Sequence, residues 1–271
     1  MNLNTVKEIK RPGSADEILH WRDGDAWLAG GTWLFSEPQV HTDTLIDLVG
    51  LKWPSLQASP DGLEIAATCK VIELHDFEAP QDWTAAPLLR ECVLSFLSSF
   101  KIWNEATVGG NVVMSLPAGP MTSLTASLEG VCTLWPRNGA PRHIPVVDFV
   151  TGNHQNVLGP GELLRSIHLP ATALRKKFGF RRSSLTHLGR SAVLLIGTLG
   201  PDGTFILTIT AATLKPVQLR FDAPPSKEEL RVAIDTNVPD HLYLDDVHGS
   251  PAYRRHLTYH FGEEIRAELA S

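Results

Sequence analysis

The sequence predicts an α+β protein, because three different patterns follow one another along its 271 residues. The first stretch alternates short apolar segments with one helix signal. The middle mixes helical and strand-like segments between Gly, Pro and Asn turns. The last part begins with a β-meander and ends in a charged helical tail. We therefore expect one domain over residues 1–170, with subdomains 1–54 and 55–170, and a second over residues 171–271.

The N-terminal unit reads as strand, helix and two further strands. Alternating residues predict a strand over Thr5–Ile9, which ends at a Pro-Gly turn. Ser14 and Glu17 have capping-box spacing and predict a short helix. Apolar runs predict strands over Ala26–Ala29 and Leu45–Leu48.

The rest of the chain alternates strand and helix signals up to Pro170, after which strands and then helices dominate. We expect strands or hairpins at Leu63–Ala67, Val131–Trp135 with Arg142–Ile144, Leu163–Leu169, Lys177–Ser183, Ser191–Leu199 and Thr204–Thr210. We expect helices at Pro87–Leu97, Met121–Leu128 and from Ser226 onward with a break at Pro239, and a loop entering a strand at Thr107–Met114. The three strands after Pro170 predict a three-stranded antiparallel sheet.

Composition excludes several classes of protein. Hydrophobic residues make up 43% of the chain and the net charge is -6, which excludes a disordered protein and disfavours a nucleic-acid surface. Cys69, Cys92 and Cys132 are too far apart for zinc or iron–sulfur spacing, and their odd number indicates a reducing cytoplasm. The longest apolar run, Ala192–Leu199, is too short to span a membrane. Basic residues at 175–177 and 181–182 predict a solvated basic face that could steer an acidic partner.

Two glycine pairs are the candidate ligand-binding motifs. Gly30 and Gly31 follow a predicted strand, and Gly109 and Gly110 lie in the segment 106–111. Paired glycines let a ligand approach the backbone, and consecutive amides in such a turn can accept an anion. Neither segment fits a P-loop or a Rossmann fingerprint, and each pair taken alone is also consistent with a plain tight turn.

Taken in order, these motifs and three others resemble a known family. The segments are Leu28-Ala29-Gly30-Gly31-Thr32, Ala106-Thr107-Val108-Gly109-Gly110-Asn111, Pro117-Ala118-Gly119, Glu162 to Ile167 before Pro170, and Ser250 to Leu257. They are similar to the FAD-binding medium subunit of the xanthine dehydrogenase and carbon monoxide dehydrogenase class of molybdenum hydroxylases. The resemblance covers almost the whole chain. It implies a vanillyl-alcohol-oxidase-type (PCMH-like) FAD-binding domain of two α/β subdomains, followed by a C-terminal domain.

The resemblance also implies roles for individual residues toward non-covalent FAD. Backbone amides expected to cradle the pyrophosphate and ribityl chain belong to Leu28, Ala29, Gly30, Gly31, Thr32, Trp33, Leu34, Val108, Gly109, Gly110 and Asn111. Thr107 and Asn111 would add side-chain bonds, and Leu164 would pack against the isoalloxazine. Arg181 falls near a family lysine beside the flavin; an exposed strand residue is the alternative. No catalytic acid, base or metal ligand is expected on this chain.

The function implied by the resemblance is electron relay. A large molybdopterin subunit would oxidise the substrate, a small [2Fe-2S] subunit would deliver electrons, and FAD would pass them to NAD+, oxygen or another acceptor. Two positions depart from the family: Leu116 stands where a serine is usual, and Pro120 where an aspartate is usual. Proline offers neither a side-chain acceptor nor an amide, and Thr122 or Ser123 could substitute. Two alternatives stay open: an assembly subunit that has lost FAD, which Pro120 favours, and a stand-alone flavin reductase of the cell-wall precursor type.

Overall fold

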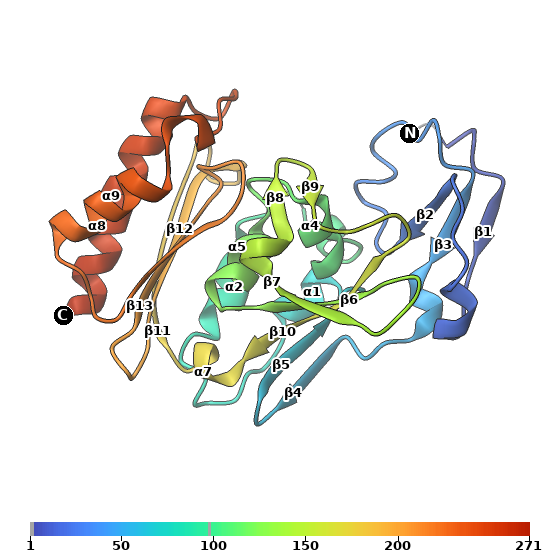
Figure 1. Ribbon diagram of the computed structural model, residues 1–271, viewed down its shortest axis with the longest axis horizontal. Helices are drawn as coiled ribbons and strands as arrows, with labels where there is room; N and C mark the ends of the chain where they lie inside the picture. Colours follow the sequence, from blue (N-terminus) through green and yellow to red (C-terminus); the bar gives the residue numbers. More distant parts are fainter. Residues whose placement is uncertain (1–2, 97–98) are drawn as a thin grey trace.

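Three larger β-sheets follow one another along the chain, and the computed structural model, which describes residues 3–96 and 99–271, places them side by side (Figure 1). The N-terminal sheet lies at one end. A five-stranded sheet with its helices forms the middle. A four-stranded sheet at the other end carries the last two long helices on its outer side.

The N-terminal sheet is parallel, with the strand order β1-β3-β2. Its strands are β1 (Glu8–Lys10), β2 (Asp25–Leu28) and β3 (Thr44–Asp47). They confirm the three predicted strands with ends shifted by one to three residues. The predicted helix is a 3-10 turn, η1 (Ala15–Ile18), and the Ser14 hydroxyl donates to the Glu17 carboxylate instead of capping a backbone amide.

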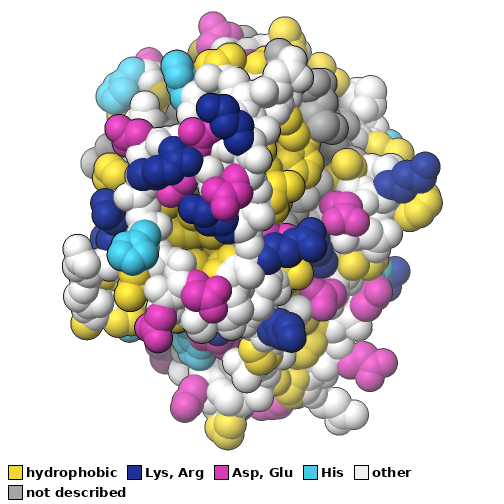
Figure 2. Space-filling model, turned by 90° about the vertical axis from the view of Figure 1, so that its right-hand side faces the viewer, with side chains coloured by type: hydrophobic (Ala, Val, Ile, Leu, Met, Phe, Trp, Pro, Cys, Tyr) yellow, Lys and Arg dark blue, Asp and Glu magenta, His cyan; other side chains and the backbone are white. Residues whose placement is uncertain are grey.

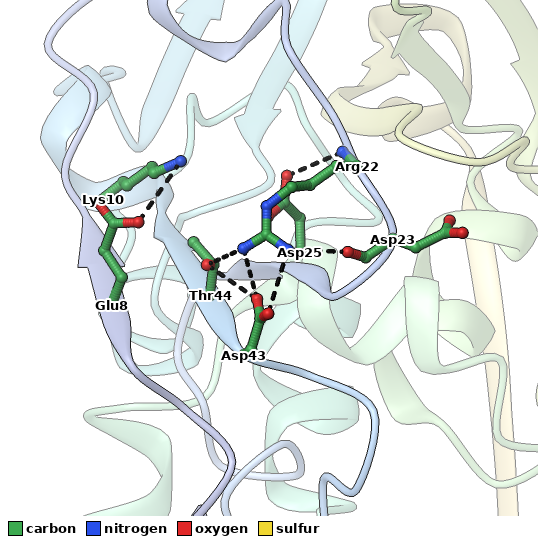
Figure 3. Close-up of polar contacts among 7 residues, drawn as sticks. All are labelled: Glu8, Lys10, Arg22, Asp23, Asp25, Asp43 and Thr44. Carbon is green, nitrogen blue, oxygen red and sulfur yellow. Dashed lines mark hydrogen bonds and ion pairs between the residues drawn. The ribbon is translucent and has the colours of Figure 1, made fainter.

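Arg22 holds this sheet together at the start of β3 (Figure 3). Its guanidinium donates to Asp43 Oδ1 at 2.6 Å and to the Thr44 hydroxyl at 2.7 Å. The Arg22 backbone amide donates to Asp25 Oδ2 at 3.0 Å, so the turn before β2 is tied to both strands. Arg22 thus links the turn before β2 to the start of β3.

The middle sheet is antiparallel, with the strand order β4-β5-β10-β6-β7. The strands are β4 (Leu56–Ser59), β5 (Gly62–Ala66), β6 (Val131–Trp135), β7 (Arg142–Pro145) and β10 (Leu163–Pro170). The other elements of this part are α1 (Val71–His75), α2 (Pro87–Leu94), α3 (Phe100–Trp103), α4 (Val108–Met114), α5 (Pro120–Ser127), α6 (Val146–Phe149), α7 (Ala171–Leu174) and the β8–β9 ladder (Val150–Gly152, Gln155–Asn156). Leu97, the last residue of one predicted helix, lies outside the described residues.

The segment 107–114 differs from its prediction, since it forms helix α4 where we expected a loop entering a strand. Valine and glycine are weak helix formers, and this favoured the wrong assignment. The helix forms because Thr107 caps it, with the hydroxyl accepting from the Gly110 amide at 3.0 Å. Tertiary packing adds to this, because a Cβ on Gly109 would lie 2.5 Å from Ala67.

The C-terminal sheet has four antiparallel strands, where the sequence predicted three. They are β11 (Lys177–Ser184), β12 (Ser191–Leu199), β13 (Phe205–Thr210) and β14 (Val217–Phe221). The fourth was missed because its five residues include the polar Gln218 and Arg220 on one face. Helices α8 (Lys227–Asn237) and α9 (Pro251–Ala270) cover the outer face, as the helical tail predicted.

Two of the hydrogen bonds that join the C-terminal sheet to the middle of the molecule lie at α5 and the segment before it. The hydroxyls of Ser123 in α5 and Thr210 in β13 are hydrogen-bonded at 2.7 Å. The Ala211 amide donates to the Pro117 carbonyl at 2.8 Å. The segment that leads into α5 is therefore held against the end of β13.

On the face in Figure 2, which looks onto the N-terminal side, basic and acidic side chains are intermixed with apolar ones. Within residues 3–96 and 99–271, no helix combines the length and the apolar character needed to cross a membrane.

Candidate functional site

A cavity of about 280 Å³ lies between the loop after β2 and the N-terminal half of α4. Both glycine motifs line it, although they are about 80 residues apart in the sequence. The predicted site residues on its wall are Leu28, Ala29, Gly30, Gly31, Thr32, Trp33, Leu34, Thr107, Gly110 and Asn111. The structure therefore brings together most of the residues that the sequence singled out.

Gly30 and Gly31 allow the two motifs to meet. A Cβ on Gly30 would collide with the backbone of Glu105, just ahead of the second motif. Gly31 has φ +70°, a left-handed conformation that other residues rarely adopt, and a Cβ there would lie 2.5 Å from the Phe35 ring. Both glycines are thus required by geometry, one for close approach and the other for the turn.

The first loop presents unbonded amides to the cavity. The backbone N–H groups of residues 30–34 have no hydrogen-bond partner among the residues that the structure describes, and all five residues line the cavity. Gly31 starts a turn in which its carbonyl accepts from the Phe35 amide at 2.8 Å. Successive free amides in such a turn form a nest for an anion, and charge-assisted bonds to them contribute about 1.5–3 kcal/mol each.

The second motif uses its amides differently. Those of Val108 and Gly109 donate to the carbonyls of Cys69 and Ala67, and those of Gly110 and Asn111 donate to Thr107. These four N–H groups already have partners, so they are not available for the amide cradle that the resemblance implied. The motif instead forms a close wall: Gly110 faces the cavity, whereas Val108 is fully buried behind it.

A second cavity of about 90 Å³ adjoins the first, and Trp27, Ala29, Gly110 and Val113 line both. Leu164, the predicted flavin contact, is buried in its wall. The Trp27 indole is fixed at one edge, because its Nε1 donates to the Glu162 carbonyl at 3.2 Å. Leu164, on β10, therefore lies two residues after Glu162, whose carbonyl anchors this indole.

Glu162 is itself held by an ion pair. Arg142 donates to both of its carboxylate oxygens at 2.6 Å, and the Gly159 amide donates to it at 3.0 Å. The hydrogen bonds from Arg142 hold the pKa of Glu162 below its usual value, against the effect of burial. Glu162 is therefore charged at neutral pH and fixes the start of β10 beside Trp27.

Arg181 lies away from both cavities. Its guanidinium donates to Glu264 at 2.8 Å and Glu268 at 2.7 Å, both on α9. Arg181 pairs with Leu195, which packs in the apolar cluster under α9. The structure thus places this predicted flavin neighbour on the outer face of the C-terminal sheet.

The next residue, Arg182, lies on the inner face. It pairs with Leu194, which packs with Phe180 in the apolar cluster of the middle part. Its guanidinium donates to the Ser191 hydroxyl and to the His187 and Gly189 carbonyls, with no carboxylate partner within the described chain. Burial lowers its pKa. Because successive side chains of a strand point to opposite faces, Arg181 lies on the outer face with two glutamate partners, whereas Arg182 lies on the inner face without a carboxylate partner in the described chain.

The predicted basic face is largely neutralised within the chain. Lys176 is buried and paired with Glu129, Arg175 donates to Asp82 at 2.7 Å, and Arg181 is held by α9. Arg175 and Lys177 are exposed, whereas Arg181 and Arg182 are half-buried. Three of the five cations are thus paired within the chain, and only part of the run is solvated as expected.

Helix α5 begins at Pro120, the position of the missing aspartate. The Asn111 side chain reaches this end of the helix, where its Oδ1 accepts from the Met121 amide at 3.0 Å. Asn111 thus joins the wall of the cavity to the N-terminus of α5. The same bond fixes the orientation of its side-chain amide and leaves the NH₂ group as the free donor end.

Sequence reasoning missed the apolar part of the wall. The missed residues are Trp27, Phe96, Ile102, Ala106, Val113, Met114 and Leu116. Most flank the glycine motifs directly, so their position beside the motifs was the available signal. Their apolar character alone did not distinguish them from core residues.

The cysteines and acidic groups show no sign of a metal site. Cys69, Cys92 and Cys132 are free and buried, and burial raises the pKa of all three thiols, that of Cys132 to about 12. Across the described ranges, no group of three or more His, Cys, Asp or Glu residues could hold a metal ion.

Known proteins were then compared with this chain. The model of the FAD binding domain in molybdopterin dehydrogenase matches residues 6–172. Xanthine dehydrogenase of Oryza sativa subsp. japonica is 26% identical over 143 residues, and xanthine dehydrogenase 1 of Arabidopsis thaliana is 27% identical over 124 residues. The matched regions are 50% and 44% of this chain but 9% of each relative, so the chain corresponds to a small part of those proteins.

Solved structures share the fold over almost the full length. Carbon monoxide dehydrogenase from Hydrogenophaga pseudoflava has a TM-score of 0.81 at 17% identity, covering 98% of this chain and 97% of that one. Quinoline 2-oxidoreductase from Pseudomonas putida 86 has a TM-score of 0.79 at 17% identity, covering 98% and 96%. Since the family model covers more than half of the chain, the protein belongs to the family of FAD binding domains in molybdopterin dehydrogenases.

Proposed function

We propose that this chain is the electron-transfer subunit of a multi-subunit molybdenum hydroxylase and holds FAD in the cavity beside the loop after β2. The observation that carries the proposal is the row of five free amides at residues 30–34 on the cavity wall. A pyrophosphate is the anionic part of FAD, and neutral amides can hold it without a Lys or Arg in the loop.

Each part of the site has a distinct task in this proposal. The amides of residues 30–34 bind the pyrophosphate, and Thr107 and Asn111 bring polar side chains to the opposite wall. Trp27 and Leu164 supply apolar surface for the flavin, with Trp27 fixed by its bond to Glu162. Bound FAD supplies the redox chemistry, since a flavin exchanges electrons singly or in pairs.

We further propose that the partners are a large molybdopterin subunit and a small [2Fe-2S] subunit, with NAD+, oxygen or another acceptor receiving the electrons. Support comes from the family and from the structural neighbours, one of which is described as a carbon monoxide dehydrogenase that lacks the Mo-pyranopterin moiety of its molybdenum cofactor. The proposal includes a cytoplasmic location, a vanillyl-alcohol-oxidase-type fold for residues 1–170 and a separate C-terminal domain over residues 171–271.

The test is the identity and reactivity of the bound cofactor. The purified chain is incubated with FAD, desalted and denatured with acid, and the released flavin is identified by chromatography. We expect FAD at about one equivalent, and we expect a reduced iron–sulfur partner subunit to bleach its absorbance. Recovery of no flavin, or a bound flavin that this partner cannot reduce, contradicts the proposal.

Pro120 supports one rival, an assembly subunit that has lost FAD. It is buried at the first position of α5 and has no side-chain acceptor there. One lost hydrogen bond reduces affinity by up to about tenfold. The same incubation distinguishes the two functions, because an assembly subunit still associates with its partners but retains no flavin.

A further inference from the structure

The N-terminal end of α5 holds a buried hydroxyl without a partner. Thr122 is 2% exposed, and its Oγ1 has no hydrogen-bond partner within residues 3–96 and 99–271. Buried hydroxyls are nearly always hydrogen-bonded, because leaving one unsatisfied costs about 1–3 kcal/mol. Thr122 Oγ1 is one of five such atoms in the described residues, and it needs an explanation because it lies at the N-terminal end of α5.

The hydroxyl lies at the start of the helix, next to two residues of the cavity wall, although Thr122 itself does not line the cavity. A Cβ built on Gly119, the residue before α5, would lie 3.4 Å from Thr122 Oγ1 and 3.1 Å from Asn111 Oδ1. It would lie 3.0 Å from the Leu116 carbonyl oxygen. Asn111 and Leu116 both line the 280 Å³ cavity. Three polar atoms from two cavity-lining residues and Thr122 therefore surround Gly119.

The neighbouring hydroxyl provides a contrast on the same helix. Ser123 is equally buried, but its hydroxyl is engaged by the Gly119 carbonyl at 3.3 Å and by Thr210 Oγ1 at 2.7 Å. Ser123 therefore serves the junction with the C-terminal sheet, and only Thr122 of this adjacent pair has an unused hydroxyl.

We infer that the Thr122 hydroxyl is a cofactor contact, which bonds a polar group of FAD at the N-terminus of α5 and takes over the role that Pro120 cannot fill. The inference rests on the proposed function, since FAD must bind for the bond to form. Pro120 removes both a side chain and an amide from this end of the helix. Asn111 already satisfies the Met121 amide, so the polar groups of Thr122, the third residue of the helix, are the next ones at this end.

The inference predicts that loss of the Thr122 hydroxyl does not lower the stability of the apoprotein but weakens FAD binding. Thr122→Val keeps the shape of the side chain and removes the hydroxyl. In the apoprotein it should leave the melting temperature unchanged or raise it, because an unsatisfied buried group is lost. Its FAD dissociation constant should rise about two- to tenfold, the share of one hydrogen bond. Thr122→Ser restores the hydroxyl and should restore the affinity.

Ser123→Ala is the matched control. It should lower the melting temperature of the apoprotein, because Thr210 loses one of its two hydrogen-bond partners, and leave the FAD dissociation constant unchanged. The affinities are measured by titrating FAD into each apoprotein and following flavin fluorescence. If the wild-type chain binds FAD and Thr122→Val binds it equally well, or if Thr122→Val destabilises the apoprotein, the inference is overturned and the proposed function stands. If the wild-type chain binds no FAD, the proposed function itself fails.

Discussion

The backbone of Glu105 occupies the space that a Cβ on Gly30 would need. This contact joins the loop after β2 to the segment that leads into α4, and the cavity lies between the two. It shows why the two glycine motifs act as one site although they are far apart in the sequence. The first supplies free amides and a close approach, and the second supplies a wall whose amides are already bonded.

Gly30→Ala should separate the two motifs and abolish FAD binding. The added methyl group meets backbone, which cannot move aside as a flexible side chain can, so the loop must shift. We expect a loss of about 1–3 kcal/mol in the free energy of unfolding, together with retention of no flavin after desalting. Urea unfolding and flavin absorbance measure the two effects.

Gly13→Ala is the control for the same chemical change. A Cβ there has ordinary contact at 3.7 Å from the Glu17 carboxylate, and Gly13 lies outside the cavity wall. It should bind FAD as the wild type does. Normal flavin content in Gly30→Ala would show that the loop can relax without losing the site.

The ion pair of Glu162 with Arg142 should make stability depend on acid pH. The pKa of Glu162 is held below its usual 4.5, so the carboxylate contributes stability that is fully present above that value. The contribution is lost as the pH falls through 4.5 toward the pKa of the folded state. Glu162→Gln should cost about 1 kcal/mol at neutral pH, since Arg142 is partly exposed, and the difference from wild type should shrink below about pH 4.

Urea unfolding followed by tryptophan fluorescence measures this dependence. Trp27 reports directly, because its Nε1 bonds the Glu162 carbonyl. The exposed Glu91, whose carboxylate has no ion-pair partner among the described residues, gives the control Glu91→Gln, which should match wild type at both pH values. A constant difference between Glu162→Gln and wild type down to acid pH would argue against the pair as the cause.

Variants of Arg181 and Arg182 should distinguish an arginine that only stabilises the fold from one whose charge sets the flavin potential. Arg181→Met breaks two ion pairs with partly exposed glutamates on α9, so it should cost at most about 1 kcal/mol and leave the FAD dissociation constant and flavin potential unchanged. Arg182→Met removes a cation without a carboxylate partner from the inner face of β11. If the flavin lies within reach of this inner face, the change should lower its midpoint potential by roughly tens of millivolts, because a cation close to a flavin favours the anionic reduced form.

Potentials are measured by titration with reference dyes on FAD-bound variants. A shift with Arg181→Met and none with Arg182→Met would restore the role that the resemblance gave to Arg181. Equal potentials in both variants would place the flavin beyond the reach of either charge.

Local patterns predicted most of the strands but not every element. Runs such as Ser191–Leu199 are long and apolar enough to identify a buried strand. The segment 107–114 is a helix because of a cap at Thr107 and the packing of Gly109 against Ala67, and the second of these is not visible in local propensity. Strand β14 is short and half polar, so its pairing with β13 decides its structure.

For the candidate site, the motifs identified segments that line one cavity, but not which of their amides are already hydrogen-bonded. Whether an amide is free depends on its partners: Val108 bonds the Cys69 carbonyl, which lies in another part of the chain. The face of Arg181 depends on strand alternation, in which one residue reverses the direction of the side chain. The sequence offers both Thr122 and Ser123 as substitutes for the missing aspartate, and only the structure shows that Ser123 is engaged and Thr122 is not.

The most direct measurement is a calorimetric titration of the wild-type apoprotein with FAD and, separately, with riboflavin. If the free amides of residues 30–34 hold a pyrophosphate, FAD should bind saturably at one equivalent. Riboflavin, which lacks the pyrophosphate, should then bind at least about a hundredfold more weakly, the share of two charge-assisted hydrogen bonds. Equal affinities for FAD and riboflavin, or no binding of FAD, would contradict the assignment of this loop as the pyrophosphate site.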